Sequence, residues 1–225
     1  MEVIQITKKQ AEPFVLKKHY SRKMPMFRCA FGLVEDGYLV GVCTFGSPSA
    51  PIEKYAFKDR DFGLYELTRL VVQTKNKNAA SFLIANALKL LPQPCAVVSY
   101  ADTEQGHSGI VYQASNWIYT GATKSHDHLY LIDGVRTHPR SLVAKGITNP
   151  KEWAKQNGIH TVAPFEKHRY FFFCGDKRQK KAMLAALAYP VLKEYPKSEK
   201  RTYDDGPTVL VDAQDAKGSD LSEFL

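Results

Sequence analysis

The first strong pattern in the chain is a pair of runs rich in apolar, aromatic and β-branched residues, at positions 27–34 and 38–45. They flank the turn Glu35-Asp36-Gly37, and Asp-Gly pairs favour the tight turns that join antiparallel strands, so this pattern predicts a β-hairpin. Residues 64–72 form another strand-like run, and residues 95–100 are apolar without alternation. A short continuous apolar run is typical of a strand covered on both faces of a sheet.

Helical patterns separate these runs. Thr7 and Gln10 form a capping-box signature for a helix that ends near residue 20, although the regular helix can also begin at Pro13, since proline suits a first turn. Asn78 can cap a second helix that runs to Leu91, before two prolines. Because this helix connects two predicted strands, it implies a parallel crossover.

The remaining patterns complete one mixed α/β domain in the order β-α-β-β-β-α-β-α-β-β. Further strands are predicted at residues 3–6, 117–120, 129–132 and 168–174, and further helices at residues 108–115, 150–157 and 178–192. We interpret residues 1–201 as a single domain in which about 136–201 is a basic elaboration. Residues 202–225 are interpreted as an acidic tail, partly disordered beyond its apolar segment 208–211.

Charge adds the first functional indication. The net charge is +8 and the sequence pI about 9.2, which points to a polyanionic partner. Residues 145–201 carry 13 basic and 5 acidic side chains, whereas residues 202–225 carry 1 and 6, so the positive charge is concentrated ahead of the tail. No stretch has the roughly 20 consecutive apolar residues of a membrane span, and the N-terminus lacks a signal-peptide pattern. We therefore expect a cytoplasmic protein with no membrane partner.

Polar residues gather at the ends of two predicted strands, in Glu66-Leu67-Thr68-Arg69 and Ser99-Tyr100-Ala101-Asp102. If these strands are parallel neighbours, their carboxyl ends open onto one crevice, where ligands of α/β sheets bind. Arg69 and Asp102 are therefore candidate site residues. The alternative is structural: Asp102 caps a turn and Arg69 pairs with Glu66.

A second cluster, His19-Tyr20-Ser21-Arg22-Lys23, ends the first predicted helix. Its imidazole can act as a general base and its phenol can stack on a nucleobase. The structural alternative is a helix C-terminus that favours cations.

Two further features are weaker. The turn before the second helix contains Lys75 and Lys77 but no glycine, so its side chains and the helix N-terminus are better placed to hold an anion than its backbone. His126 and His128 lie on one face of an extended segment, but a metal site needs a further ligand that the local spacing does not supply.

These residues together resemble a known family. The run from Tyr100-Ala101-Asp102 through Gly106-His107-Ser108-Gly109 to Tyr112-Gln113-Ala114-Ser115-Asn116-Trp117, preceded by His19-Tyr20-Ser21 and Glu66-Leu67-Thr68-Arg69, is similar to the Mom DNA-modification proteins of Mu-like phages. The resemblance covers about residues 1–135 in order. It implies a GNAT-like α/β fold: a mixed, mostly antiparallel sheet with a central parallel strand pair and flanking helices.

The resemblance also implies an activity. It suggests an acyltransferase-like enzyme of the host cell cytoplasm that transfers a carbamoylmethyl group (acetamido or isomeric glycyl) to N6 of adenine in double-stranded DNA, protecting it from host restriction. Functional roles are implied for His19, Tyr20, Arg69, Asp102 and Tyr112. Asp102 or His19 would accept the N6 proton, Tyr112 would donate to the leaving group or orient the base, and Arg69 would stabilise negative charge.

In a GNAT-like fold the central parallel strands splay apart and the gap receives the donor, here acetyl-CoA or an aminoacyl-tRNA such as glycyl-tRNA. The expected donor-binding residues are Leu70, Val71, Val72, Lys75, Lys77, Asn78, Ala79, Ser99 and Asn116. The expected DNA-binding residues are Arg22, Lys23, Lys167, Arg169, Lys177, Arg178, Lys180 and Lys181. The resemblance also suggests iron, for which His107, His126 and His128 are the local ligand candidates.

Two other functions are compatible with the sequence. A GNAT N-acetyltransferase acting on a small-molecule or protein amine would work without DNA. A noncatalytic DNA-binding accessory protein would depend on its basic second half and tolerate substitution of Arg69 or Asp102.

Overall fold

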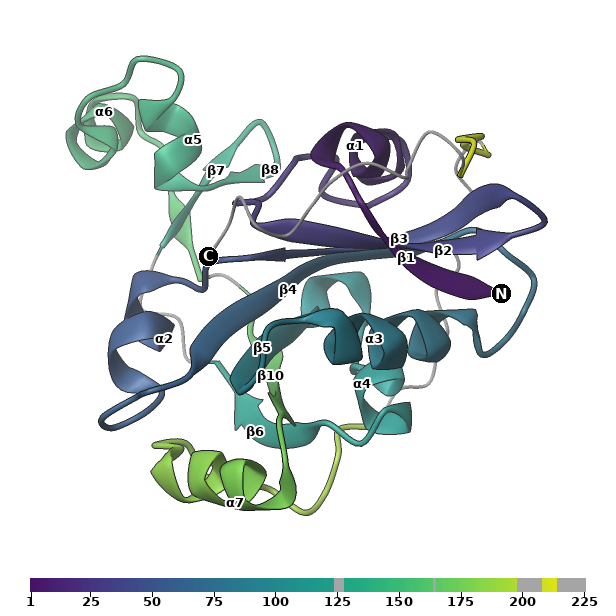
Figure 1. The fold of residues 1–225 in the computed structure, drawn as a ribbon. Coiled ribbons are helices and arrows are strands. Elements are labelled where there is room, and N and C mark those ends of the chain that lie inside the picture. Colours follow the sequence, from purple (N-terminus) through teal and green to yellow (C-terminus); the bar gives the residue numbers. More distant parts are fainter. Residues whose placement is uncertain (124–127, 164, 198–207, 214–225) are drawn as a thin grey trace.

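The computed structural model describes residues 1–123, 128–163, 165–197 and 208–213. Its centre is a seven-stranded sheet (Figure 1) in the order β1-β2-β3-β4-β5-β10-β6. These strands are β1 (Glu2–Ile6), β2 (Cys29–Glu35), β3 (Tyr38–Gly46), β4 (Gly63–Val72), β5 (Cys95–Asp102), β10 (Lys167–Cys174) and β6 (Ile118–Ala122). All neighbours are antiparallel except β4 and β5, which are parallel. The expected sheet, mostly antiparallel with one central parallel pair, is confirmed.

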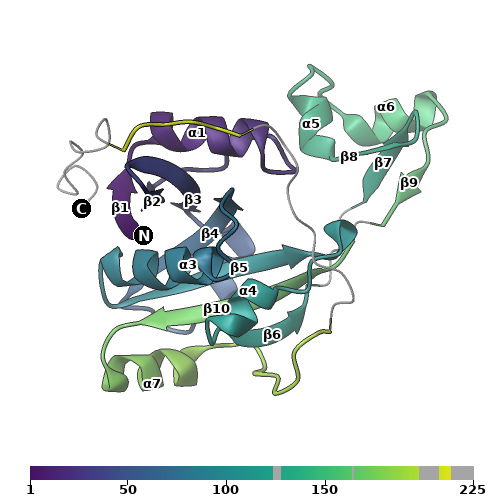
Figure 2. The same ribbon diagram turned by 90° about the vertical axis from the view of Figure 1, so that its right-hand side faces the viewer.

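Helices cover both faces of this sheet (Figures 1 and 2). α3 (Ala79–Leu90) and α4 (Ile110–Ala114) lie on one face, and α1 (Lys8–Lys17), α2 (Ala50–Tyr55) and α7 (Lys177–Ala186) lie on the other. We call these the α3 face and the α1 face. Each strand supplies apolar residues to both faces, because successive strand side chains point in opposite directions.

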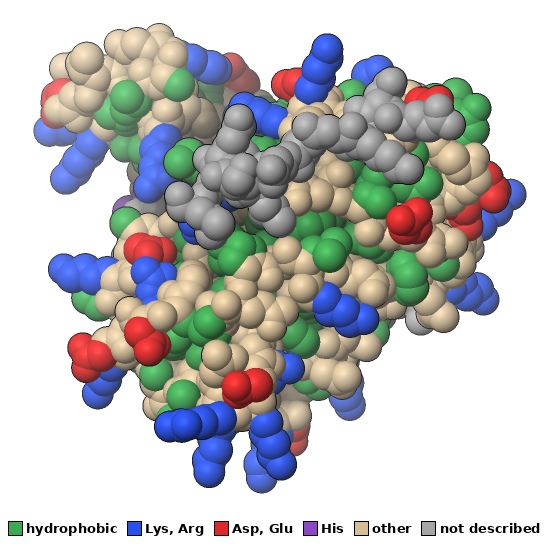
Figure 3. All heavy atoms as spheres, viewed as in Figure 1, with side chains coloured by type: hydrophobic (Ala, Val, Ile, Leu, Met, Phe, Trp, Pro, Cys, Tyr) green, Lys and Arg blue, Asp and Glu red, His purple; other side chains and the backbone are tan. Residues whose placement is uncertain are grey.

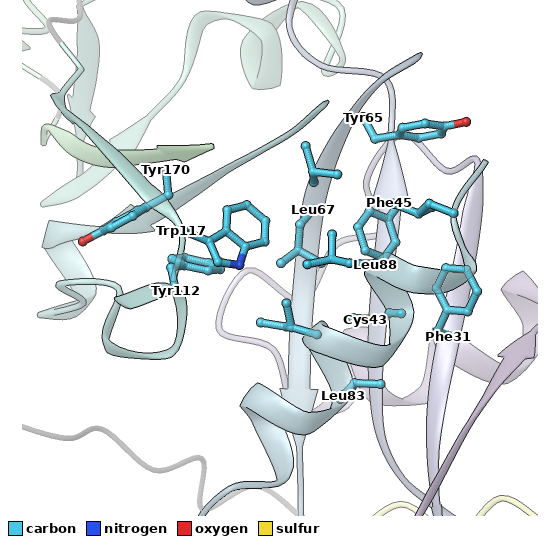
Figure 4. Close-up of a cluster of buried hydrophobic side chains, with 14 of the residues drawn as sticks. Phe31, Cys43, Phe45, Tyr65, Leu67, Leu83, Leu88, Tyr112, Trp117 and Tyr170 are labelled. Atoms are coloured by element: carbon cyan, nitrogen blue, oxygen red, sulfur yellow. The ribbon is translucent and has the colours of Figure 1, made fainter. Parts of the chain in front are cut away.

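The largest buried cluster lies on the α3 face. Figure 4 shows Trp117, Tyr112 and Tyr170 on one side of it and residues such as Leu67 and Leu88 on the other. The Trp117 side chain is fully buried, and its ring centroid lies 5.0 Å from that of Tyr112. This aromatic packing joins α4 and β6 to the centre of the sheet.

Several element boundaries differ from the sequence predictions. The Thr7 capping box is confirmed, since the Thr7 hydroxyl accepts from the Gln10 amide and the Gln10 side chain accepts from the Thr7 amide. The helix therefore begins at Lys8 with Pro13 inside it, and a start at Pro13 was wrong. The predicted loop before β4 contains α2, which carries a proline in its first turn, where no amide hydrogen is needed.

The helices at 108–115 and 178–192 were predicted too long. α4 begins only after Gly109, whose φ of +80° is left-handed. α7 ends at Ala186, and the following segment contains Tyr189-Pro190, where helix is disfavoured before a proline. In the segment 208–211, Val209 is buried and the Val211 carbonyl accepts from the Leu39 amide.

Between β6 and β10 the chain builds a second, smaller unit, which we call the inserted lobe (residues 128–163). Its three-stranded sheet has the order β8-β7-β9, from β7 (Leu129–Ile132), β8 (Val135–Thr137) and β9 (Thr161–Val162), beside α5 (Pro139–Val143) and α6 (Pro150–Gln156). The lobe has its own hydrophobic cluster, formed by Tyr130, Leu142 and Ala154 with Ile132, Ile147, Trp153 and Ile159. The sequence predicted β7 and α6 but not β8, β9 or α5.

Gly109 is a point where the fold requires glycine. A Cβ atom at Gly109 would lie 2.5 Å from the Tyr170 ring, and φ is left-handed. We expect Gly109→Ala to lower the free energy of unfolding by about 2–4 kcal/mol, or the melting temperature by about 5–15 °C. Gly106→Ala is the control, because Gly106 is also left-handed but its Cβ would meet no atom within 4 Å. Equal melting temperatures for the two variants would contradict the packing argument.

Candidate functional site

The parallel pair β4 and β5 separates near its carboxyl end. The strands are paired from Gly63 and Cys95 to Leu67 and Ser99, and both continue beyond this point without pairing to each other. The Ser99 hydroxyl donates to the Leu67 carbonyl oxygen at 2.9 Å and lies 2.8 Å from the Tyr112 hydroxyl. The Ser99 side chain thus satisfies the Leu67 carbonyl at the point where the two strands stop pairing.

A β-bulge at Thr68 decides which side chains of β4 lie on the α1 face beyond this point. Arg69 pairs with Thr44 and Leu67 pairs with Phe45, so Thr68 is the extra residue in β4. In a regular strand residues three apart point to opposite faces. Because of the extra residue, Glu66 and Arg69 both lie on the α1 face, where each acts electrostatically on the other.

Asp102, at the end of β5, is the best-connected acidic side chain of the site. It is only 8% exposed, its Oδ2 accepts from the Tyr20 hydroxyl at 3.3 Å, and Lys167 Nζ lies 3.3 Å from the same oxygen. Its Oδ1 accepts from the amide of Glu104 in the short helix η1 (Thr103–Gln105). Both readings of Asp102 from the sequence are therefore compatible with the geometry, because one oxygen caps a turn while the other faces the cluster.

The Arg69 guanidinium reaches the same cluster from β4. Its Nε and Nη2 donate to the Lys23 carbonyl oxygen at 3.2 and 3.1 Å, and its Nη1 donates to the Thr68 carbonyl oxygen at 2.7 Å. These neutral acceptors fix the planar group without cancelling its charge. Arg69 and Asp102, expected at one crevice, both act electrostatically on Tyr20.

Glu66 was not singled out by sequence reasoning, which gave it only the role of a partner for Arg69. Burial raises the pKa of Glu66 to about 7, against the opposing effects of Arg69 and Lys167. A carboxyl group with a pKa near neutrality can exchange a proton at physiological pH. The sequence signal that could have revealed it is a carboxylate that follows the apolar start of a predicted strand and lies three residues before an arginine.

The aromatic side chains beside Asp102 form the mouth of the site. The Tyr20 ring is 48% exposed, and its centroid lies 4.3 Å from that of His19 and 5.8 Å from that of His107. Burial of the phenol end and the charge of Asp102 raise the pKa of Tyr20 above its usual range, so it remains a donor. An exposed ring beside a carboxylate suits a planar, hydrogen-bonding ligand.

His19 and Tyr112 have more restricted positions. The Ser21 amide donates to His19 Nδ1 at 3.1 Å, so the neutral ring carries its proton on Nε2. Tyr112 is 8% exposed, and burial raises the pKa of Tyr112 to about 12. Its hydroxyl lies beside Ser99, where the two strands stop pairing.

The residues expected to bind a donor do not all lie together. Leu70, Val71 and Val72 follow the point where β4 loses its β5 partner, so this edge of β4 presents backbone amides that an extended amide chain can pair with. Asn116 instead lines a groove of about 440 Å³ along α7, with Lys177 and Lys180.

The turn between β4 and α3 satisfies much of its own backbone. The amides of Asn76, Asn78 and Ala79 donate to Thr74 Oγ1, Asn76 Oδ1 and the Asn76 carbonyl, respectively. Lys75 and Lys77 are exposed. The residues therefore fit an acyl or aminoacyl carrier whose amide-bearing arm follows β4 and whose phosphates are held by lysine side chains rather than by a backbone cradle.

The expected DNA-binding residues separate into two groups. Arg22, Lys23, Lys167 and Arg169 lie beside the site, although Arg169 is occupied: its Nε donates to Thr120 Oγ1 and its guanidinium lies 3.4 Å from the Tyr189 ring centroid. Lys177, Arg178, Lys180 and Lys181 lie on α7, which begins after the opposite end of β10 and packs back against Phe171 and Phe173 on the α1 face.

No metal cluster is found in the part of the chain that the structure describes. Among those residues, no three His, Cys, Asp or Glu side chains are grouped so that they could hold an ion. His107 packs edge-on to Tyr20, and burial lowers the pKa of its imidazole. His126 lies outside the described residues. Nothing in the described residues supports the expectation of iron at His107 or His128.

Within the described chain, no helix has the length and apolar character needed to span a bilayer.

Comparisons with known proteins agree with the sequence resemblance. The family model of the Mom protein family matches residues 1–197. The methylcarbamoylase mom of Escherichia phage Mu is 28% identical over 203 residues, which cover 83% of this chain and 80% of that protein.

Among solved structures, a GNAT-family acetyltransferase from Bacillus cereus is similar, with a TM-score of 0.42, 10% identity and coverage of 78% of this chain and 98% of that one. Arabidopsis thaliana NAA60, solved in complex with acetyl-CoA, has a TM-score of 0.44, 13% identity and coverage of 76% and 97%.

Proposed function

The chain belongs to the Mom protein family, and we propose that it is a DNA-modifying transferase that adds a carbamoylmethyl group to N6 of adenine in phage DNA. The relative in phage Mu, a methylcarbamoylase, supports transfer of a group of this kind. The observation that carries the proposal is the gathering of Glu66, Arg69, Asp102 and Tyr20 where β4 and β5 part. These side chains suit a flat base with an exocyclic amine. Modification of that amine would protect the DNA from host restriction nucleases.

The half-exposed Tyr20 ring would stack on the adenine, and Asp102 would accept a hydrogen bond from its N6 amino group. Inside a duplex this amine is stacked and paired, so the adenine has to leave the helix, at a cost of a few kcal/mol. The basic residues beside the site, Lys23 and Lys167, would hold the neighbouring phosphates.

Proton transfer is the chemical task of this chain's own residues. Adenine N6 is a weak nucleophile because its lone pair is delocalised into the ring. As the new N6–carbon bond forms, the bond between that carbon and the donor's leaving atom breaks, and the N6 proton passes to the Glu66 carboxylate. Arg69 would stabilise negative charge that develops on the transferred group or leaving group. Kinetic measurements can establish whether the proton leaves N6 before or after the N6–carbon bond forms.

The donor supplies the electrophilic carbon when it is bound. The open edge of β4 at Leu70–Val72 would hold its arm, and Lys75 and Lys77 would hold its phosphates. Acetyl-CoA and glycyl-tRNA both carry phosphates and an acyl carbon. The glycyl group has the same atoms as a carbamoylmethyl group, so its transfer supplies the whole added group, whereas the acetyl group of acetyl-CoA lacks nitrogen and would need a separate nitrogen donor.

The lysine assignment predicts a donor-specific effect. Lys75→Ala/Lys77→Ala should raise KM for whichever of acetyl-CoA and glycyl-tRNA supports the reaction by about tenfold, equivalent to about 1.4 kcal/mol, with kcat nearly unchanged. Lys8→Ala/Lys9→Ala is the control, because it removes two exposed charges at the start of α1. Steady-state kinetics at saturating DNA measure both. If the two double variants have the same KM, Lys75 and Lys77 do not contribute to donor binding.

The experiment that tests the function is expression of the chain with a plasmid, followed by enzymatic digestion and mass spectrometry of the nucleosides. We expect a deoxyadenosine that carries the added group, and plasmid DNA that resists restriction cleavage. Unmodified deoxyadenosine beside an abundant, folded protein would contradict the proposal. Acetylation of a small-molecule or protein amine without DNA would favour an N-acetyltransferase, and DNA binding without modification would favour an accessory protein.

A further inference from the structure

We propose that the inserted lobe is the surface that grips double-stranded DNA next to the reaction centre, an inference that rests on the proposed function. The lobe stands beyond the end of the main sheet at which β5 ends and β10 begins (Figures 1 and 2). Asp102 is the last residue of β5 and Lys167 the first of β10. A duplex that delivers an adenine to Asp102 therefore has to pass close to the lobe.

The lobe carries positive charge that its own fold does not neutralise. It contains five lysines and arginines against two acidic residues, Asp133 and Glu152. Lys145, Lys151 and Lys155 are exposed, and none of them forms an ion pair with a carboxylate among the described residues. Figure 3 shows Lys and Arg side chains projecting from this part of the molecule. Unpaired lysines of this kind suit DNA as a partner. When they bind its phosphates, they release the counterions condensed on the DNA, and this release favours binding.

The lobe's packing holds these cations in fixed positions. Its hydrophobic cluster includes Leu142 of α5 and Ala154 of α6, which are almost completely buried. Lys151 and Lys155 are four residues apart on α6, so they lie on the same side of that helix. A platform with its own core can bring several lysines to successive phosphates with little loss of backbone entropy.

The lobe is also attached directly to the site. Arg136 forms an ion pair with Glu104 at 3.3 Å, two residues after Asp102, and its guanidinium lies 4.1 Å from the Phe165 ring centroid. The Thr103 hydroxyl of η1 also donates to the carbonyl oxygen of Glu166, the residue before β10. These contacts fix the base of the lobe against η1, so DNA held by the lobe is held in register with Asp102.

The rival surface is α7, which carries four lysines and arginines and no acidic residue but begins after the other end of β10. The two surfaces permit a matched comparison. Lys145→Gln/Lys151→Gln/Lys155→Gln removes three charges from the lobe, and Lys177→Gln/Lys180→Gln/Lys181→Gln removes three charges from α7. Neither triple variant touches Glu66, Arg69, Asp102 or Tyr20, and circular dichroism and thermal melting would confirm that both are folded.

Fluorescence anisotropy with a labelled 30-base-pair duplex, at 50–200 mM salt, measures affinity without requiring the reaction. We expect the lobe variant to bind about 100-fold more weakly near 0.1 M salt, with the slope of log K against log salt reduced by about 3. The α7 variant should stay within about threefold of the unmodified protein. A smaller loss in the lobe variant than in the α7 variant, or no loss, would overturn the proposal.

The result separates this inference from the proposed function. In one outcome the lobe variant loses duplex affinity while plasmid DNA from the expression experiment contains only ordinary nucleosides. That pair of results would support the lobe as a DNA-binding surface and contradict the proposed transferase activity. Modified deoxyadenosine produced equally well by the lobe variant at physiological salt would retain the transferase and reject the lobe.

Discussion

Replacement of Asp102 by asparagine is expected to lower kcat/KM for DNA modification by about 1000-fold. Asp102 is nearly buried and is shared by Tyr20 and Lys167, so its charge sets the electrostatics of the whole cluster. Loss of one positioned electrostatic group in an enclosed site typically costs a factor of about 100–1000. Asparagine would also present an amide donor where the proposed N6 amino group needs an acceptor, which places the effect at the upper end.

The control for this variant is Asp133→Asn, in the exposed turn between β7 and β8. Asp133 has a left-handed φ of 49°, which asparagine also tolerates, so the fold is preserved. Quantitative nucleoside mass spectrometry compares the two variants. Thermal melting checks the cap on the Glu104 amide, which the side-chain oxygen of the introduced asparagine can still form. If Asp102→Asn modifies DNA at more than one tenth of the original rate, the Asp102 carboxylate is not required for the reaction.

The second large effect is expected at Glu66. With a pKa of about 7, Glu66 is mostly protonated at pH 6 and mostly ionised at pH 8. If its carboxylate accepts the N6 proton, kcat should rise about tenfold per pH unit below 7 and level off above it. Glu66→Gln should lower the plateau by at least about 100-fold and abolish this inflection. The pH dependence of single-turnover modification measures both.

The stability of Glu66→Gln distinguishes chemistry from misfolding. The folded-state pKa lies above the unfolded value, so the contribution of Glu66 to stability is greatest at low pH and declines as the pH rises through about 7. Above pH 7 the amide variant should melt at the same temperature as the original protein or higher, because it no longer buries a charge. Glu2→Gln, at an exposed position on β1, should change neither the pH profile nor the melting temperature.

Local sequence patterns were sufficient for most of the main sheet. The Asp-Gly turn, the β-branched runs and the helix between residues 64–72 and 95–100 depend on backbone conformation and on hydrophobic periodicity over a few residues. They predicted the hairpin β2–β3 and the parallel crossover that brings Arg69 and Asp102 close enough to act on the same side chain, Tyr20. Where prediction was wrong, as at α2 and the end of α7, the outcome depended on short segments with weak periodicity next to prolines.

The inserted lobe illustrates a different limit. Its strands have two to four residues each, too few for an alternating pattern to be read, and its cluster joins residues from Tyr130 to Ile159. Such an arrangement is stabilised by contacts between distant positions rather than by local preference. The sequence could therefore indicate a basic region after residue 136, but not that it folds as a separate unit beside the site.

Sequence alone determined the family resemblance, the net positive charge and the presence of Arg69, Asp102 and Tyr20 in the same protein. Tertiary structure decided how these side chains are arranged. The bulge at Thr68 places Glu66 on the same face as Arg69, and burial there raises its pKa. The fold also places the inserted lobe beyond the end of the main sheet at which β5 ends (Figure 2), and ties it there through Arg136 and Glu104. Charge is encoded residue by residue, but a proton affinity or a binding surface depends on distances and solvent exposure, which exist only after the chain has packed.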